Sequence, residues 1–376
     1  MHAILAPSAG GVWAPIGGCR AAPLFAASFP ELGDKQAALE GEASHWVGEQ
    51  LLTGRSTPKE LDTAPNGVTL TAEMIEGAQM YVATVLQHAL IDEVHVEQRI
   101  ECPSIHELCF GTPDAWWYDR ANHTLYIFDY KFGHQWVDVF ENWQLVIYAS
   151  GIMDLLGFNG LHDQYLKIRF FIVQPRAYGR GGPVREWSVS NANAIGSDLR
   201  AMINIAANSA AEALSGEAKA TSGPHCKHCP ARAHCPAALK GASQLYEATA
   251  DPFALELDEY SLGVQLQIVS DAVERLEALK TGYEELIEHK LRNGTTVPGW
   301  QMQASSGRED WTMTQDAVLR MGQLLGVNLI AKAKTPNQAR KLGIPAQLVD
   351  ANSERKTGSL KLTKHNENHI RKLFYV

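Results

Sequence analysis

The chain has 376 residues and a mass of 41.3 kDa, enough for two domains, because single domains commonly contain roughly 100 to 200 residues. Its net charge of −9 and isoelectric point of about 5.9 exclude a protein coated in positive charge, although a metal-loaded groove on an acidic protein can still be locally positive. No apolar run approaches the length of a membrane span, and the first 22 residues lack a secretory signal. We therefore expect a cytoplasmic protein that has no membrane partner.

The first part of the chain is predicted to form two helices and a strand. Apolar residues at intervals of three and four predict helices over residues 35–53 and 68–90, and His45 lies on the first of them. Alternating residues predict a strand over residues 94–100, which carries Glu97. Taken alone, either side chain is explained as well by a place in the core or on a solvated face as by a metal site.

The central stretch is predicted to be a hairpin of two short strands over residues 115–128, joined by a polar turn. Asp114 precedes the first strand, and Asp129 and Lys131 follow the second. Because side chains alternate along a strand, Asp129 and Lys131 share one face and Tyr130 lies on the other. Two carboxylates and an ammonium at strand ends suit a magnesium site with a built-in charge stabiliser. For an isolated pair of acids and a lysine, turn capping and a solvated ammonium are the more common explanation.

Helices and one more strand are predicted after the hairpin. Gln144 and Tyr148 stand one helical turn apart and therefore share a face. Residues 166–175 form the clearest apolar strand, which ends at a proline. Helical patterns follow over residues 191–218 and 258–291. A mixed α/β sheet flanked by helices follows from this order of elements.

Three motifs in this order resemble those of the RecB-like branch of the PD-(D/E)XK nuclease superfamily. They are G-x-x-D at residues 111–114, D-Y-K at residues 129–131 and Q-x-x-x-Y at residues 144–148. The resemblance implies a restriction-endonuclease-like sheet and a Mg²⁺- or Mn²⁺-dependent deoxyribonuclease. It also implies roles for individual residues: metal ligation by His45, Asp114, Asp129 and the Tyr130 carbonyl, assistance of attack by Lys131, and places in the cleft for Gln144, Tyr148 and Glu97.

Six cysteines are present, and three of them form a C-x2-C-x5-C cluster, namely Cys226, Cys229 and Cys235. In a cytoplasmic chain such clustered thiols indicate metal binding rather than disulfides. A four-coordinate site needs one more ligand. His225, His228 or His234 would complete a zinc site, and Cys102 or Cys109 also precedes the cluster.

The RecB-like resemblance supplies another candidate for the missing ligand. In its iron-sulfur members, three such cysteines join one far upstream to hold a [4Fe-4S] cluster, and Cys19 stands in that upstream place. The resemblance therefore implies an iron-sulfur cofactor held by Cys19, Cys226, Cys229 and Cys235, with Zn²⁺ as the alternative metal.

A change in the sequence pattern after the cysteine cluster predicts two domains. They are a nuclease domain over residues 1–245 and an α+β accessory domain with a basic tail over residues 246–376. Residues 2–8, the helix around His45, the D-Y-K core and the segment near Pro298 resemble the DUF2800 family of phage and prophage proteins. That resemblance implies an exonuclease that processes DNA ends in a bacterial host cell, with a phage single-strand annealing protein as its partner. The alternatives are a non-catalytic DNA-end binding or scaffold protein that retains the fold, and a zinc-finger-type interaction module.

Overall fold

The structure is a computed structural model that describes residues 3–32, 35–158, 161–177, 182–250, 258–312, 314–327, 329, 335–336, 339 and 343–364. The chain divides into two compact units, Met1–Gly282 and Tyr283–Val376. This division falls later than the 245/246 boundary expected from the sequence. The reason lies in α8 (Glu259–Arg292), whose buried Leu279 packs with Cys226 of the first unit.

The first unit is built on a five-stranded mixed sheet with strand order β1-β4-β5-β6-β7. Its β4 and β5 are antiparallel, β5 and β6 are parallel, and both edge strands pair antiparallel with their neighbours. The strands are β1 (His95–Val96), β4 (Ala115–Asp119), β5 (Thr124–Tyr130), β6 (Lys167–Val173) and β7 (Val184–Val189). A separate antiparallel pair is formed by β2 (Ile100–Glu101) and β3 (Phe110–Gly111).

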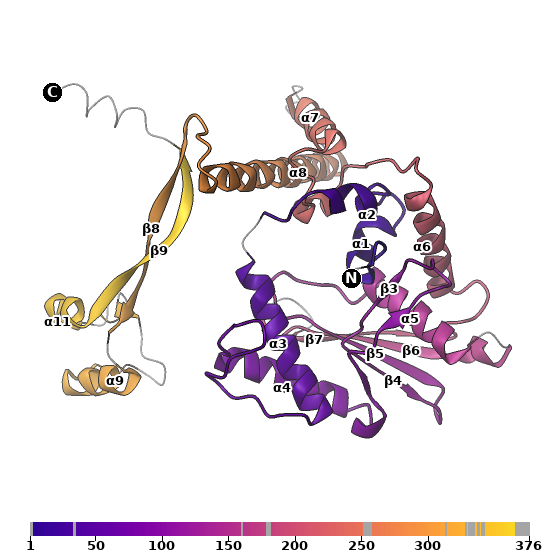
Figure 1. Cartoon of the computed structure of the whole chain (residues 1–376), viewed down its shortest axis with the longest axis horizontal. Coiled ribbons are helices and arrows are strands. Elements are labelled where there is room, and N and C mark those ends of the chain that lie inside the picture. The colour runs from indigo at the N-terminus through magenta and orange to yellow at the C-terminus, as the bar shows by residue number, and fades with distance from the viewer. Residues whose placement is uncertain are drawn as a thin grey trace. The chain divides into compact units, whose positions relative to one another are not determined.

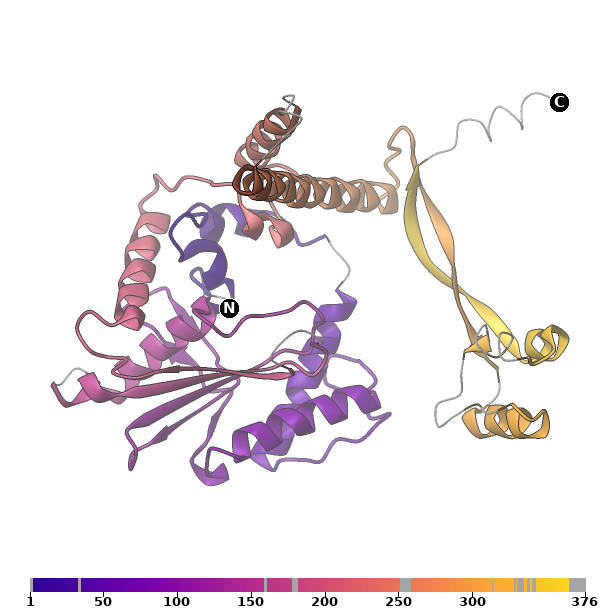
Figure 2. The same cartoon turned by 180° about the vertical axis from the view of Figure 1, so that it is seen from behind.

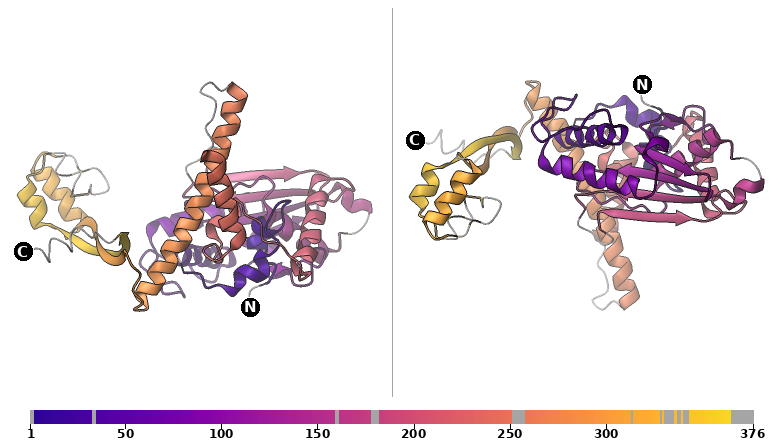
Figure 3. Two further views of the ribbon diagram at one scale, coloured as in Figure 1. Left: turned by 90° about the horizontal axis from the view of Figure 1, so that it is seen from above. Right: turned by 90° about the horizontal axis from the view of Figure 1, so that it is seen from below.

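Helices cover both faces of the sheet, as Figure 1 and the reverse view in Figure 2 show. One core lies between the sheet and α3 and α4, which stand in front of the strands in the right panel of Figure 3. The other core joins the opposite face to α1, α5 and α6. The helices of the unit besides α8 are α1 (Gly10–Trp13), α2 (Ala22–Phe25), α3 (Gln36–Thr53), α4 (Ala72–Leu86), α5 (Trp143–Leu156), α6 (Asp198–Leu214) and α7 (Pro236–Ala250).

Capping side chains set where three of these helices begin. Thr71, Asn142 and Ser197 each accept a hydrogen bond from a backbone N–H in the first turn of the helix that follows. The helices predicted over residues 68–90 and 191–218 therefore begin several residues later than the apolar pattern suggested. The helix that carries Gln144 and Tyr148 begins directly before Gln144.

The single strand predicted over residues 94–100 is wrong in its extent, because the chain breaks at Glu97. This residue has a left-handed φ of 49°, which a non-glycine residue rarely adopts. On either side of it the chain pairs differently: β1 lies against β4, and β2 lies against β3. The break brings Glu97 to the end of β1, beside the start of β4.

The second unit contains a long antiparallel pair, β8 (Trp300–Trp311) and β9 (Ser353–Lys364). The described helices α9 (Gln315–Leu324) and α11 (Ala346–Ala351) contribute Val318 and Val349 to a small apolar cluster. The predicted basic tail, residues 355–372, begins within β9, and its residues beyond 364 lie outside the described part of the chain. Among the described residues, no helix combines the length and apolar character needed to cross a membrane.

Candidate functional site

The antiparallel hairpin of β4 and β5 brings the two predicted aspartates together. Ala115 at the start of β4 is paired with Phe128 near the end of β5. Asp114 therefore lies beside the end of β5, where its Oδ2 accepts a hydrogen bond of 2.6 Å from the Tyr130 backbone N–H. Asp129 is almost completely buried, with an exposed fraction of 3%. A buried carboxylate requires compensating partners, and the residues around it supply them.

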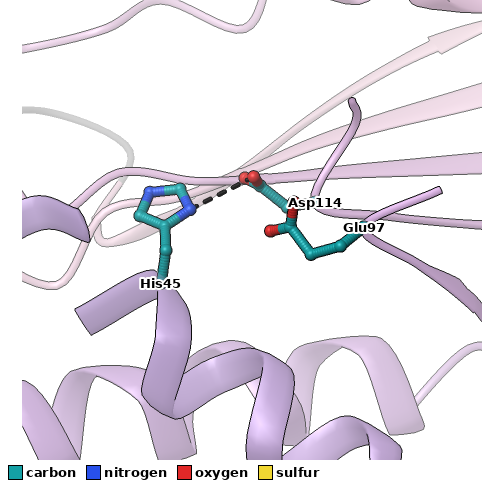
Figure 4. A group of neighbouring side chains, drawn as sticks. All are labelled: His45, Glu97 and Asp114. Atoms are coloured by element: carbon teal, nitrogen blue, oxygen red, sulfur yellow. Dashed lines mark hydrogen bonds and ion pairs between the residues drawn. The ribbon is translucent and has the colours of Figure 1, made fainter. Parts of the chain in front are cut away.

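Three side chains from distant parts of the sequence converge at this end of the sheet. His45 from α3, Glu97 after β1 and Asp114 before β4 each offer a ligand atom, and the three atoms lie within 4.8 Å of one another (Figure 4). His45 Nδ1 is 3.1 Å from Asp114 Oδ1. The Glu97 backbone N–H donates to the Asp114 carbonyl over 3.1 Å, which holds the two acidic residues side by side. One imidazole and two carboxylates form a donor set suited to a divalent cation.

A second group adjoins this one on the α5 face of the sheet. The Lys131 ammonium donates to Asp129 Oδ1 over 3.0 Å and to Gln144 Oε1 over 3.1 Å, and Gln144 Nε2 donates to the same Asp129 oxygen over 2.9 Å. Tyr148, one turn further along α5, donates its hydroxyl proton to the Thr112 carbonyl over 3.1 Å. The structure thus brings together the residues of all three sequence motifs.

The group of clustered ligand atoms includes a residue that the sequence placed only in the cleft. Glu97, and not Asp129, completes the three-residue group with His45 and Asp114. In this arrangement an Asp129 oxygen is engaged by Lys131 and Gln144. Tyr130 was expected to contribute its backbone carbonyl as a ligand. The backbone N–H of the same residue donates a hydrogen bond to Asp114.

The tyrosine ring of the D-Y-K motif lies on the opposite face, as the alternation along β5 predicts. Its hydroxyl is 2.7 Å from the Ser44 hydroxyl, and its ring stacks on Tyr81 of α4 at a centroid distance of 5.0 Å. Ser44 precedes His45 on α3, so this contact ties the histidine-bearing helix to β5. Ser44 was not singled out from the sequence, although a serine on the apolar face of a helix is a usable signal.

Nearby negative charges raise the pKa of both basic groups of the site. Burial would lower the pKa of Lys131, but the negative charges of Asp129 and Asp114 outweigh it and raise that pKa. The same balance raises the pKa of His45, with Asp114 as the opposing charge. Lys131 is therefore an ammonium at neutral pH and suits charge stabilisation rather than proton abstraction.

The pKa values of the three acids are not all shifted in the same direction. Burial would raise the pKa of Asp114, but the nearby His45 charge and hydrogen bond lower it overall. For Asp129 burial dominates over the Lys131 charge, and its pKa is raised. Two effects raise the pKa of Glu97 to about 7: the larger is partial burial of its carboxyl, and the second is repulsion from Asp114. Part of Glu97 remains exposed, so solvent weakens this repulsion; a cation between the acids would relieve it.

The four predicted cluster cysteines, Cys19, Cys226, Cys229 and Cys235, line one small cavity between the N-terminal segment and the start of α7. Cys102 and Cys109 lie elsewhere, fully buried in the core beneath α5. The long-range fold therefore distinguishes Cys19 from the two other upstream cysteines. Ala238 and Ala242 of α7 and Leu279 of α8 pack against Cys226 and close the cavity from that side.

His225 stands between the two ends of this cysteine group. Hydrogen bonds with Cys19 and Cys226 raise the pKa of His225 to about 10. Burial would raise the thiol pKa of both cysteines, but His225 and backbone donors lower it. Lowered thiol pKa values favour thiolates, which are the form that binds metals.

The spacing of the ligand atoms around this cavity can be compared with that of a zinc site. A tetrahedral zinc site with Zn–S bonds of about 2.3 Å places its thiolates roughly 3.8 Å apart. In the part of the chain that the structure describes, only the His45 group has three such ligand atoms within 4.8 Å of one another. Among the described residues around the cavity, no three cysteine or histidine ligand atoms therefore lie as close together as in a single zinc site.

A buried glutamine, which sequence reasoning missed, supports the loop after Lys131. The Gln174 side chain is fully buried and donates to the Gly133 and Gln135 carbonyls over 2.8 and 2.6 Å. Arg185 donates to Gln174 Oε1 over 2.7 Å and to the Val137 carbonyl over 2.8 Å. The only signal in the sequence is a polar residue directly after an apolar strand.

Comparison with protein-family models gives one match, to the family described as "Protein of unknown function (DUF2800)", and it extends over residues 2–329. The chain belongs to the DUF2800 family. The DUF2800 match includes the whole of the first unit except its first residue, and with it both the acidic site and the cysteine cavity. It also reaches α9 of the second unit.

Proposed function

We propose that this DUF2800 protein is a metal-dependent DNA nuclease of the PD-(D/E)XK type that processes DNA ends. The observation that carries the proposal is the convergence of Asp114, Asp129 and Lys131 at the end of the β4–β5 hairpin, with His45 and Glu97 beside them. The topology supports it as well, because the antiparallel strands β1, β4 and β5 are followed by α5 and by β6 parallel to β5.

The residues fit a Mg²⁺ or Mn²⁺ ion held by Asp114, Glu97 and His45, with Asp129 adjoining. When bound, such an ion supplies a water of lowered pKa and neutralises charge on the phosphate. His45 would hold the ion through a ring nitrogen that carries no proton. Lys131 remains an ammonium and stabilises negative charge on the scissile phosphate. Gln144 holds both Lys131 and Asp129 and therefore fixes the direction of the ammonium.

We also propose that Cys19, Cys226, Cys229 and Cys235 hold a [4Fe-4S] cluster. Four thiols around one cavity, lowered thiol pKa values at Cys19 and Cys226, and ligand atoms less closely spaced than in a single zinc site all support this assignment. The cluster would join the start of the chain to the segment before α7, a structural role. Zn²⁺ is the alternative occupant.

We further propose that the nuclease processes DNA ends in phage-type recombination or repair. An exonuclease in such a pathway leaves single strands, so a single-strand annealing protein is the partner that we propose. Both would act in the cytoplasm of a bacterial host.

The experiment that tests the function is digestion of DNA labelled at either the 5' or the 3' end, in linear and covalently closed circular form. With Mg²⁺ or Mn²⁺ we expect labelled products from linear DNA, no cleavage of circles, and no products in the presence of a chelator. Intact linear DNA under all conditions would instead support a non-catalytic DNA-end binding protein.

Replacement of Glu97 by glutamine should weaken Mn²⁺ binding on the order of 10-fold or more, because one of the charged ligands is lost. Isothermal titration calorimetry on the metal-free protein measures this effect. Glu101→Gln is the matched control, since Glu101 is exposed and paired with Arg99 on the surface. Equal Mn²⁺ affinities for wild type and Glu97→Gln would remove Glu97 from the proposed ligand set.

A further inference from the structure

Two aromatic side chains are exposed on the loop that joins Lys131 to α5. Trp136 has an exposed fraction of 38% and Phe140 one of 60%, whereas Phe132 and Val139 of the same loop are buried. Large aromatic rings are usually buried because of the apolar area that they present to water. Here the loop turns two of them outward within nine residues of the lysine.

The backbone of this loop is fixed although it has no regular secondary structure. Gln174 binds the carbonyls of Gly133 and Gln135 and accepts from the Val137 N–H over 3.2 Å. Asp138 Oδ1 accepts from the Phe140 N–H over 3.0 Å. A buried network of this kind holds the loop in one conformation. The aromatic rings are consequently presented in defined positions.

The two rings are also oriented by their neighbours. The Arg185 guanidinium lies 4.0 Å from the centroid of the Trp136 ring, and it is anchored by Gln174 and the Val137 carbonyl. Phe140 packs edge-on against Trp187 at 5.6 Å. A cation against the tryptophan ring holds it in place, while Trp136 as a whole stays 38% exposed.

One polar side chain of the cysteine loop reaches the segment that carries these rings. His228 Nε2 is 3.0 Å from Gln135 Oε1, so the segment between Cys226 and Cys229 contacts the residue before Trp136. Lys227 in that segment is exposed, as is His134 on the loop itself. Aromatic surface combined with nearby positive charge is the combination that binds single-stranded nucleic acid, through base stacking and phosphate contacts.

We propose that Trp136, assisted by Phe140, is a stacking site for unpaired bases of the strand cut at the neighbouring acidic site. This inference rests on the proposed nuclease function and names the substrate class: a single strand or a frayed duplex end. The five residues from Lys131 to Trp136 span at most about 18 Å, so the stacked base lies within a few nucleotides of the scissile phosphate. Bases inside a duplex are already stacked on each other and do not reach the ring.

The test measures binding apart from cleavage, in a Lys131→Ala background. Fluorescence anisotropy gives the affinity for a labelled oligo(dT) strand and for a blunt duplex of the same length. We expect Trp136→Ala to weaken single-strand binding about 10- to 100-fold and duplex binding less than about 3-fold, in line with the loss of a stacking contact only. Trp136→Phe should recover most of the single-strand affinity, because the ring is kept.

Tyr165→Ala is the matched control, because Tyr165 is an exposed aromatic that precedes β6, at the opposite end of the sheet from Lys131. Phe140→Ala is a second variant, and melting curves show whether each protein is folded. An unchanged single-strand affinity in folded Trp136→Ala and Phe140→Ala would overturn the stacking site and leave the rings as a protein-contact surface. Equal losses on both substrates would overturn it too. If the wild type binds and cuts DNA in either case, the proposed function stands without the stacking site.

Discussion

Replacing Lys131 by alanine is expected to lower the rate of DNA cleavage by at least about 100-fold, in the range seen when a preorganised electrostatic contact to the reacting group is removed. The ammonium is held by Asp129 and Gln144 over 3.0 and 3.1 Å, and the surrounding acids keep it charged. It is therefore placed to stabilise charge on the phosphate from the start of the reaction. Single-turnover cleavage of end-labelled DNA with saturating Mg²⁺ measures the effect.

Lys167→Ala is the control for this change, because Lys167 is an exposed lysine at the start of β6, the end of the sheet distant from Lys131. Mn²⁺ titration of the Lys131→Ala protein shows whether the change affects metal binding. None of the three clustered ligand atoms belongs to Lys131, so the Mn²⁺ affinity should be unchanged. If both lysine variants cleave as fast as the wild type, Lys131 has no part in the chemistry. The non-catalytic alternative needs a different result, namely a wild type that does not cleave DNA.

Replacing Cys229 by serine is expected to remove the cluster and to lower the melting temperature by about 10 °C, because metal binding at such a site contributes directly to folding. Anaerobically purified wild type should be brown and absorb near ~400 nm, the property of thiolate-bound iron. The serine variant should be colourless and poor in iron. Metal analysis, the absorption spectrum and a thermal melt measure all three effects.

Cys102→Ala is the matched control for the cluster, because Cys102 is a fully buried cysteine outside the cavity. This variant loses some core packing but should keep its colour and iron. A colourless wild type with one bound zinc would replace the iron-sulfur assignment by the zinc site. A wild type that contains neither metal would refute both.

Local signals were sufficient for much of the site. Alternation along a strand predicted that Asp129 and Lys131 share a face, and the spacing of Gln144 and Tyr148 predicted one side of a helix. These are properties of a few consecutive residues, and tertiary packing did not alter them. The mixed α/β sheet flanked by helices also followed from the order of the elements.

Properties that depend on distant contacts could not be obtained in the same way. The turn at Glu97 has a backbone conformation that no local pattern signals, and it brings the Glu97 carboxyl beside Asp114 and His45. The proximity of Cys19 to the cluster requires the complete first unit. A basic, glycine-rich sequence such as residues 176–185 is compatible with phosphate contacts and equally with a solvated turn. In the structure, Arg176 pairs with Glu40 and Glu73, and Arg185 supports Gln174.

The contact between His228 and Gln135 can form only late in synthesis, because the two residues are far apart in the sequence. Cys19 emerges from the ribosome early, whereas the segment with Cys226 and His228 follows roughly 200 residues later, on the order of 10 to 40 s at 5–20 residues per second. Until then the loop bearing Trp136 lacks this neighbour. In a nascent chain the residues of the acidic site are therefore made well before the segment that contacts this loop.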